Sequence, residues 1–175
     1  MFYVIQVSPA KEAQTEAKIE KEIKDRLQVT CFHLTRKIKK KFRGTWHDVT
    51  QKLLPGYIFI DTDQMEELYG ELKKIPMLTK LLGREDDLFI SLNPEEEAWV
   101  RRLISQGTDV PISRIGFDEG DRVVILSGPL MDMEGQIKKY NLHRRTAEVE
   151  VDFMGNKTVI FLGIDVVGKK DDLAD

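Results

Sequence analysis

Residues 36–43 read RKIKKKFR, a run of six basic side chains with no acid among them. Lysine and arginine at this density are typical of a surface that neutralises nucleic-acid phosphates. Phe42 and Trp46 lie in and just after the run, and either ring could stack on an unpaired base. The alternative is a solvated loop whose lysines only maintain solubility. The basic residues of the run are Arg36, Lys37, Lys39, Lys40, Lys41 and Arg43.

A second basic cluster lies in the stretch IKKYNLHRRTA, within a C-terminal segment that is acidic overall. Planar guanidinium groups suit phosphate forks and stack on splayed bases, so RNA is the expected ligand. Among the three histidines, only the one beside Arg144 is expected to have a role, as an RNA contact. The alternative is an exposed turn that happens to be basic. The cluster consists of Lys138, Lys139, His143, Arg144 and Arg145, with Lys157 in the next turn.

Catalytic and metal-binding patterns are absent from the sequence. His33, His47 and His143 are scattered and form no HExxH or other ligand spacing. No glycine-rich phosphate loop follows a strand pattern, and G-x-S-x-G does not occur. The single cysteine, Cys31, begins an apolar segment and is expected to be a buried structural thiol, and 95–97 is expected to be an acidic helix start. We therefore predict no catalytic residue, no metal and no cofactor.

Composition places the chain among ordinary globular proteins. It has 175 residues, 41% hydrophobic and 33% charged, enough for one domain or two small ones. The net charge of −3 argues against a protein that coats nucleic acid and favours contact at local basic patches. One cysteine excludes an intramolecular disulfide. No signal peptide or apolar run near membrane-spanning length is found, so the expected location is the cytoplasm.

The first 107 residues alternate between strand and helix patterns. A basic hairpin with its tip near Gly44 separates two strands, and Pro55-Gly56 makes a tight turn into the next strand. Asp63 and Asn93 are the expected N-caps of two helices. This order predicts an α+β domain over 1–107, an antiparallel sheet flanked by helices. Strands are expected at 2–7, 31–39, 49–54, 57–62 and 87–92, helices at 10–27, 63–73 and 94–107, and an irregular segment or short strand at 75–84.

The C-terminal part has a different texture. Residues 108–117 lack periodicity and contain Pro and Gly, so we expect a linker. Short strand patterns follow without a helix signal, and the alternation of TAEVEV predicts that Ala147, Val149 and Val151 face one side. This spacing is typical of a small barrel, expected over 118–170. The strand patterns are DRVVILSG, GQIKKY, TAEVEV and KTVIFLG.

Several of these stretches resemble one known family. GDRVVILSGPLMDMEGQIKKY resembles a KOW motif, with Gly-Asp, an apolar strand, Gly-Pro, a loop, and Gly opening the next strand. FYVIQV, LLPGYIFI and IPMLTKLLG are similar to the N-terminal domain of the NusG family of transcription elongation factors. The resemblance implies a NusG-type N-terminal domain, a linker and a five-stranded KOW barrel, acting as a monomer without a membrane partner.

The resemblance also implies a partner for the Pro-Gly-Tyr turn. In that family the N-terminal domain lays a hydrophobic depression on the clamp helices of the largest RNA polymerase subunit, and the basic hairpin lies near the non-template DNA strand. A few central apolar and aromatic side chains could supply most of the affinity for these helices. The alternative is that these are core residues. Carried over by position, the docking residues are Phe2, Leu54, Pro55, Tyr57, Phe59 and Leu81.

Two segments bear on the branch of the family. The loop GPLMDMEG and the turn FMGNKTVI lack the aromatic loop tip and the Arg and Pro of housekeeping members, which couple polymerase to a ribosomal protein or to Rho. With the basic cluster, this resembles the LoaP-type antiterminators, whose KOW domain contacts a hairpin in nascent leader RNA. A housekeeping factor and a ribosome-associated KOW protein that binds RNA remain the alternatives. Residues available to a protein partner are Leu130, Met131, Met133 and Met154.

Overall fold

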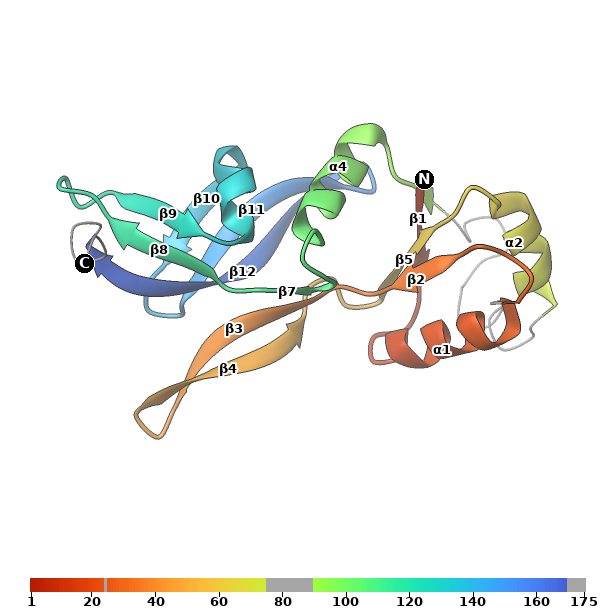
Figure 1. Ribbon diagram of the computed structural model, residues 1–175, viewed down its shortest axis with the longest axis horizontal. Coiled ribbons are helices and arrows are strands. Elements are labelled where there is room, and N and C mark those ends of the chain that lie inside the picture. The colour runs from red at the N-terminus through yellow and green to blue at the C-terminus, as the bar shows by residue number, and fades with distance from the viewer. Residues whose placement is uncertain (24, 75–89, 170–175) are drawn as a thin grey trace. The chain divides into compact units, whose positions relative to one another are not determined.

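The structure is a computed structural model in which residues 1–23, 25–74 and 90–169 are described (Figure 1). The chain divides into two compact units. The first combines 1–34 with 54–97, and the second combines 35–53 with 98–175. The basic hairpin therefore groups with the C-terminal part. These units are groupings in space, and the bounds 1–107 and 118–170 stay predictions.

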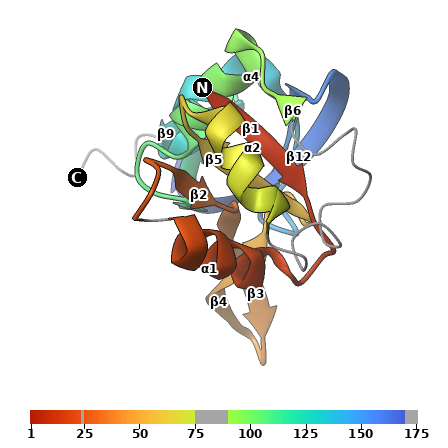
Figure 2. The ribbon, with the colours of Figure 1, turned by 90° about the vertical axis from the view of Figure 1, so that its right-hand side faces the viewer.

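Over its described residues, the first unit combines an antiparallel sheet with the helices α1 and α2, in agreement with the predicted α+β class (Figure 2). Its strands follow the order β2-β5-β1-β6, and β1 pairs antiparallel with both β5 and β6. The predicted segment 75–84 lies outside the described residues. The elements are β1 (Phe2–Gln6), α1 (Glu12–Ile23), β2 (Thr30–Phe32), β5 (Tyr57–Asp61), α2 (Met65–Lys73) and β6 (Ile90–Ser91).

Both faces of β5 are buried, which explains its uninterrupted apolar sequence. On one face Ile58 and Ile60 pack in a cluster with residues of α1 and α2. On the other face Phe59 stacks on Phe32 at a centroid distance of 5.4 Å, and Phe2 meets Phe32 edge-on at 5.8 Å. A strand buried on both faces has a continuous apolar sequence and not an alternation of apolar and polar residues.

Helix α1 is shorter than expected, and its buried face includes polar residues. It spans Glu12–Ile23 instead of 10–27. Ala13 and Ala17 are exposed, whereas Thr15 is buried. The buried stripe runs back from Ile23 in steps of three and four residues, and it reaches a threonine and a glutamate instead of the alanines. The Thr15 hydroxyl is satisfied by donating to the carbonyl of Lys11 at 2.8 Å.

Helix α4 (Pro94–Leu103) begins as predicted, with Asn93 as its cap. Asn93 Oδ1 accepts the Glu96 N–H at 2.8 Å, and Glu96 Oε2 accepts the Asn93 N–H at 3.2 Å. This is a reciprocal capping box. The predicted Asp63 cap of the preceding helix is wrong, because α2 begins after Gln64, which makes no side-chain cap bond.

Removing the Asn93 cap should destabilise the chain. Asn93→Ala leaves the Glu96 N–H without its acceptor, and the expected cost is about 1 kcal/mol of unfolding free energy. Asn93→Asp keeps an acceptor oxygen and should remain near wild type. Denaturant unfolding of both variants checks this, and equal stability of Asn93→Ala and wild type would contradict it.

The second unit contains a three-stranded sheet, β4-β3-β7, and a five-stranded sheet, β10-β11-β12-β8-β9 (Figure 1). The five strands agree with the predicted KOW-type fold, although no ladder joins β9 to β10 among the described residues, so closure into a barrel is not seen. The strands are β3 (Thr35–Phe42), β4 (Thr45–Lys52), β7 (Asp109–Val110), β8 (Ser113–Phe117), β9 (Val123–Ser127), β10 (Ile137–Asn141), β11 (Thr146–Phe153) and β12 (Asn156–Lys169).

Two expectations for the C-terminal part are wrong. The segment 108–117 is not irregular, because it contains β7 and β8, and β8 pairs with both β12 and β9. Its role as a linker between domains stays a prediction. The loop after β9 is also not free of helix, since Pro129–Gln136 forms the 3-10 segment η1. The alternation predicted in β11 is confirmed, with Ala147, Val149 and Val151 buried.

No helix in the described part of the chain is long and apolar enough to cross a membrane.

Candidate nucleic-acid interface

The basic hairpin forms as predicted and is a long two-stranded ribbon. Strands β3 and β4 pair from Thr35 with Lys52 to Phe42 with Thr45. The turn between them consists of Arg43 and Gly44, with φ angles of 49° and 80°. Two positive φ values in a two-residue hairpin loop are those of a type I′ turn, which suits the twist of the strands.

The root of this hairpin is joined to strand β12 of the same unit. Arg36 donates from Nη1 to the carbonyl of Phe161 and from Nη2 to Gln51 Oε1 at 3.5 Å. Its Nε is buried and finds no acceptor among the described residues, and burial lowers the pKa of the guanidinium. Gly163 lies so close to the hairpin that a Cβ there would be 2.3 Å from the Lys37 carbonyl oxygen. The hairpin therefore packs backbone to backbone on β12.

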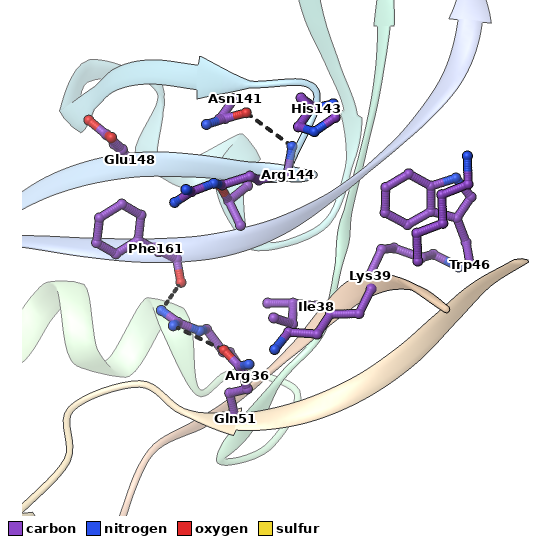
Figure 3. A pocket seen from close by; sticks show the side chains of 13 residues that line it. Arg36, Ile38, Lys39, Trp46, Gln51, Asn141, His143, Arg144, Glu148 and Phe161 are labelled. Carbon is purple, nitrogen blue, oxygen red and sulfur yellow. Dashed lines mark hydrogen bonds between the residues drawn. The ribbon is translucent and has the colours of Figure 1, made fainter. Parts of the chain in front are cut away.

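Between the hairpin and the β10–β12 region lies an open groove of about 730 Å³ (Figure 3). Its size is within the range of about 300–1,000 Å³ that is usual for ligand sites. The hairpin wall includes Ile38, Trp46 and Gln51, while Phe161 and Thr146 belong to the opposite wall. Both basic clusters found in the sequence contribute to this one groove.

The groove is strongly basic. The acidic residue that lines it is Glu148 on β11. Lys39 forms a 2.8 Å ion pair with Asp48, and mainly this hydrogen bond raises the pKa of Lys39. The Arg144 side chain is exposed, and its backbone N–H donates to Asn141 Oδ1 at 3.0 Å, which fixes the turn from which it projects. The basic side chains and histidine that line the groove are Arg36, Lys39, Lys40, Lys41, His143 and Arg144.

Two aromatic rings also line the groove. The Arg145 guanidinium lies 5.1 Å from the centroid of the Trp46 ring, and Lys41 Nζ lies 6.0 Å from it. Such cation–π contacts hold the indole in place. Phe161 is 40% exposed on β12, so its ring is accessible to a ligand in the groove. Positive charge beside exposed rings is the composition of sites that bind single-stranded nucleic acid.

Other predicted basic residues do not line the groove, and most of them have partners elsewhere. Lys37 forms an ion pair with Asp109 at 3.2 Å, and Arg43 stacks over Phe42 at the exposed hairpin tip. Lys138 pairs with Glu150 at 3.6 Å and Lys157 with Asp152 at 3.2 Å. Lys139 is exposed. The structure thus separates the groove-lining members of each cluster from the rest.

The Pro-Gly-Tyr turn is held by a buried carboxylate that sequence reasoning missed. Tyr57 N–H donates to the Leu54 carbonyl at 3.3 Å, and Gly56 has a φ of 85°, as in a type II turn with Pro at its first central position. Glu12, 2% exposed, accepts the Gly56 N–H at 2.8 Å. A glutamate in the first turn of a helix usually suggests only a dipole effect, so the sequence carried little signal of this role.

The predicted docking residues divide between surface and core. Pro55 is exposed and Tyr57 is half-buried. Phe2, Leu54 and Phe59 are buried, at 1%, 8% and 0% exposure, so they support the turn and the sheet instead of presenting free side chains. Leu81 lies outside the described residues.

The predicted partner surface of the KOW loop divides in the same way. Leu130 and Met133 are core residues at 0% and 1% exposure, because η1 turns them inward against the five-stranded sheet. The Leu130 N–H donates to Ser113 Oγ at 3.1 Å, which fixes this loop. Met131 is 51% exposed and Met154 is half-buried. Of the four residues, Met131 is the most accessible.

The remaining titratable side chains suggest packing roles. His33 Nδ1 lies 2.6 Å from Glu16 Oε1, and burial raises the pKa of Glu16. Cys31 is buried, and burial raises the pKa of its thiol far above the usual value. Over the described ranges, no group of three His, Cys, Asp or Glu residues is arranged to hold a metal ion.

Loss of the Glu12 carboxylate should loosen the Pro-Gly-Tyr turn. Glu12→Ala leaves the buried Gly56 N–H without this acceptor, at an expected cost of about 1–3 kcal/mol. Glu12→Gln retains an acceptor oxygen at the same position and should lose less. Thermal unfolding of the two variants tests this, and it is refuted if alanine proves no worse than glutamine.

Comparison with known proteins decides the family. A family described as "Transcription termination factor nusG" matches residues 1–103, and the KOW motif matches residues 119–152. The chain belongs to the NusG family.

Relatives match over nearly the whole chain. The transcription termination/antitermination protein NusG of Thermus thermophilus is 26% identical, covering 96% of this chain and 97% of that protein. The protein of the same name from Haemophilus influenzae is 22% identical, covering 96% and 93%. As a member of the NusG family, the chain is a transcription elongation factor that acts with RNA polymerase and is not an enzyme.

Proposed function

We propose that this chain is a specialised, LoaP-type antitermination factor of the cytoplasm. Its first unit binds the clamp helices of the largest RNA polymerase subunit and favours processive elongation. Its KOW region holds an element of nascent leader RNA, so that recruitment is limited to selected operons. Because tethering makes the second contact intramolecular, each contact can be weak alone.

The observation that supports RNA recruitment is the basic groove. Arg144 projects into it from a turn fixed by Asn141, and Lys40 and Lys41 approach from the hairpin. The segment around this site is otherwise acidic, so positive charge is concentrated where a backbone could lie. Arginine is suited to bidentate phosphate contacts.

The side chains proposed to contact the polymerase directly are those of the Pro-Gly-Tyr turn. Pro55 is exposed and Tyr57 is half-buried, whereas Phe59, two residues further along β5, is buried. A half-buried tyrosine offers a rigid apolar ring and a polar tip for orientation, which suits a helix end. At the hairpin tip, exposed Arg43 and Phe42 are the proposed contacts to the non-template DNA strand.

Housekeeping coupling to a ribosomal protein or Rho is the second candidate, because Met131 and Val159 are 51% and 46% exposed. Exposed methionine can form an adaptable apolar contact. Burial of Leu130 and Met133 leaves this patch smaller than the sequence suggested.

The test is a titration of the full chain with leader RNAs from its genomic neighbourhood, at several salt concentrations. The paired variant Arg144→Ala/Arg145→Ala runs beside wild type, and Lys138→Ala/Lys157→Ala is the control with equal charge loss outside the groove. We expect selective binding that weakens in the first pair only. Loss of one phosphate contact should lower the salt slope by about 0.7. Binding of a ribosomal protein with no RNA selectivity would return the chain to the housekeeping class.

A further inference from the structure

The β3–β4 hairpin and the β10–β11 turn face each other across one groove. The resemblance to the family assigns the hairpin to DNA, and the sequence assigns the turn to RNA. Yet Lys40 and Lys41 line the same space as His143 and Arg144. Arg36 joins the two walls through the Phe161 carbonyl, so the groove is a built feature of this unit. A single strand in it would contact both clusters at once.

The rings in the groove favour an unpaired strand over a duplex. Trp46 stands on the hairpin wall, and Phe161 lies on the opposite wall beside Arg144 (Figure 3). Bases stacked within a duplex cannot present their faces to such rings, whereas splayed bases can. Ile38 adds apolar surface beside them.

Acceptors in the groove favour RNA over DNA. The Glu148 carboxylate would repel phosphate, but it can accept a hydrogen bond from a ribose 2′-hydroxyl, a donor that deoxyribose lacks. The hydroxyl of Thr146 lies on the same strand and can serve similarly. A site built only for phosphate would not need a carboxylate among its basic residues.

We propose that this groove is one composite site for an unpaired segment of RNA, with Trp46 and Phe161 stacking on bases and both basic clusters holding the backbone. The inference rests on the proposed function and extends it, because it gives the root of the hairpin a role in RNA binding. Only the hairpin tip then remains for DNA.

Tryptophan fluorescence of the full chain reports on the site directly. The sequence has two tryptophans. Trp46 lines the groove, whereas Trp99 is 3% exposed and its indole N–H donates to the Asp152 carbonyl. Quenching by an oligouridine of about ten nucleotides should therefore come from Trp46. In Trp46→Phe the remaining emission should stay constant during the same titration.

Affinity measurements use matched variants of the hairpin. Trp46→Ala should weaken oligouridine binding by roughly tenfold, as expected when one stacked base is lost. His47→Ala is the control, because this ring is exposed on the same strand beside Trp46 but does not line the groove. The deoxy strand and a blunt RNA duplex of equal length serve as competing probes.

The outcomes distinguish the composite site from the proposed function. Quenching by the single strand, weaker binding of the deoxy strand and duplex, and sensitivity to Trp46 but not to His47 would support the composite site. RNA binding that depends on Arg144 and ignores Trp46 would overturn it while leaving the proposed function intact. Equal binding of the deoxy strand would overturn the RNA assignment. Absence of RNA binding by wild type, leader RNAs included, would overturn both.

Discussion

Alanine in place of Gly163 is expected to move the β3–β4 hairpin off strand β12 and to weaken RNA binding in the groove. The added Cβ would lie 2.3 Å from the Lys37 carbonyl oxygen and 3.1 Å from the Ile38 Cα. Both are backbone atoms, so the contact cannot be relieved by turning a side chain. The two walls must separate, and the Arg36 bond to the Phe161 carbonyl is then lost or stretched.

The size of the Gly163 effect follows from overpacking. Inserting a methyl group into a well-packed region costs about 1–3 kcal/mol of unfolding free energy. Loss of one base-stacking contact would lower oligouridine affinity by roughly tenfold. Gly135→Ala is the matched control, since a Cβ there meets nothing within 4 Å. Wild-type stability and affinity in Gly163→Ala would show that the hairpin does not depend on this contact.

Truncation of Trp99 is expected to give the largest loss of stability. Its ring lies in the C-terminal half of α4, packs edge-on against Phe153 at a centroid distance of 6.2 Å, and is 3% exposed. Trp99→Ala removes this burial and the bond to the Asp152 carbonyl. Core Trp→Ala substitutions cost about 3–5 kcal/mol, enough to unfold a chain of marginal stability.

A gentler substitution separates packing from hydrogen bonding at this position. Trp99→Phe keeps an aromatic ring against Phe153 but leaves the Asp152 carbonyl without the indole donor. Its expected cost is smaller than that of alanine, about 1–3 kcal/mol. Denaturant unfolding of both variants gives the order, and an alanine variant within error of wild type would contradict the packing described for α4.

Local signals in the sequence predicted much of the fold. The Asn93 cap, the glycine-containing hairpin turn and the alternation of β11 depend on neighbouring residues, and each is confirmed. The irregular backbone expected at 108–117 was wrong, because a short strand such as β8 is stabilised by partners distant in sequence. Its own residues carry no clear period, so single-sequence reasoning had nothing to detect.

The groove could not be predicted from the sequence either, because its walls come from segments distant in sequence. Arg36 and Phe161 are 125 residues apart, and neither has a pattern that signals the other. The same limit applies to the docking residues. An apolar strand buried on both faces looks like a strand with one face exposed to a partner, so Phe2 and Phe59 could not be separated from Tyr57 by sequence.

Termination assays with purified RNA polymerase would test whether leader RNA bound in the groove recruits this chain to the polymerase. Readthrough of an intrinsic terminator is measured on templates with and without the leader element, using wild type and Arg144→Ala/Arg145→Ala. Wild type is expected to raise readthrough only where the leader is transcribed, and the variant is expected to lose this gain. Equal stimulation on every template, unchanged in the variant, would contradict it.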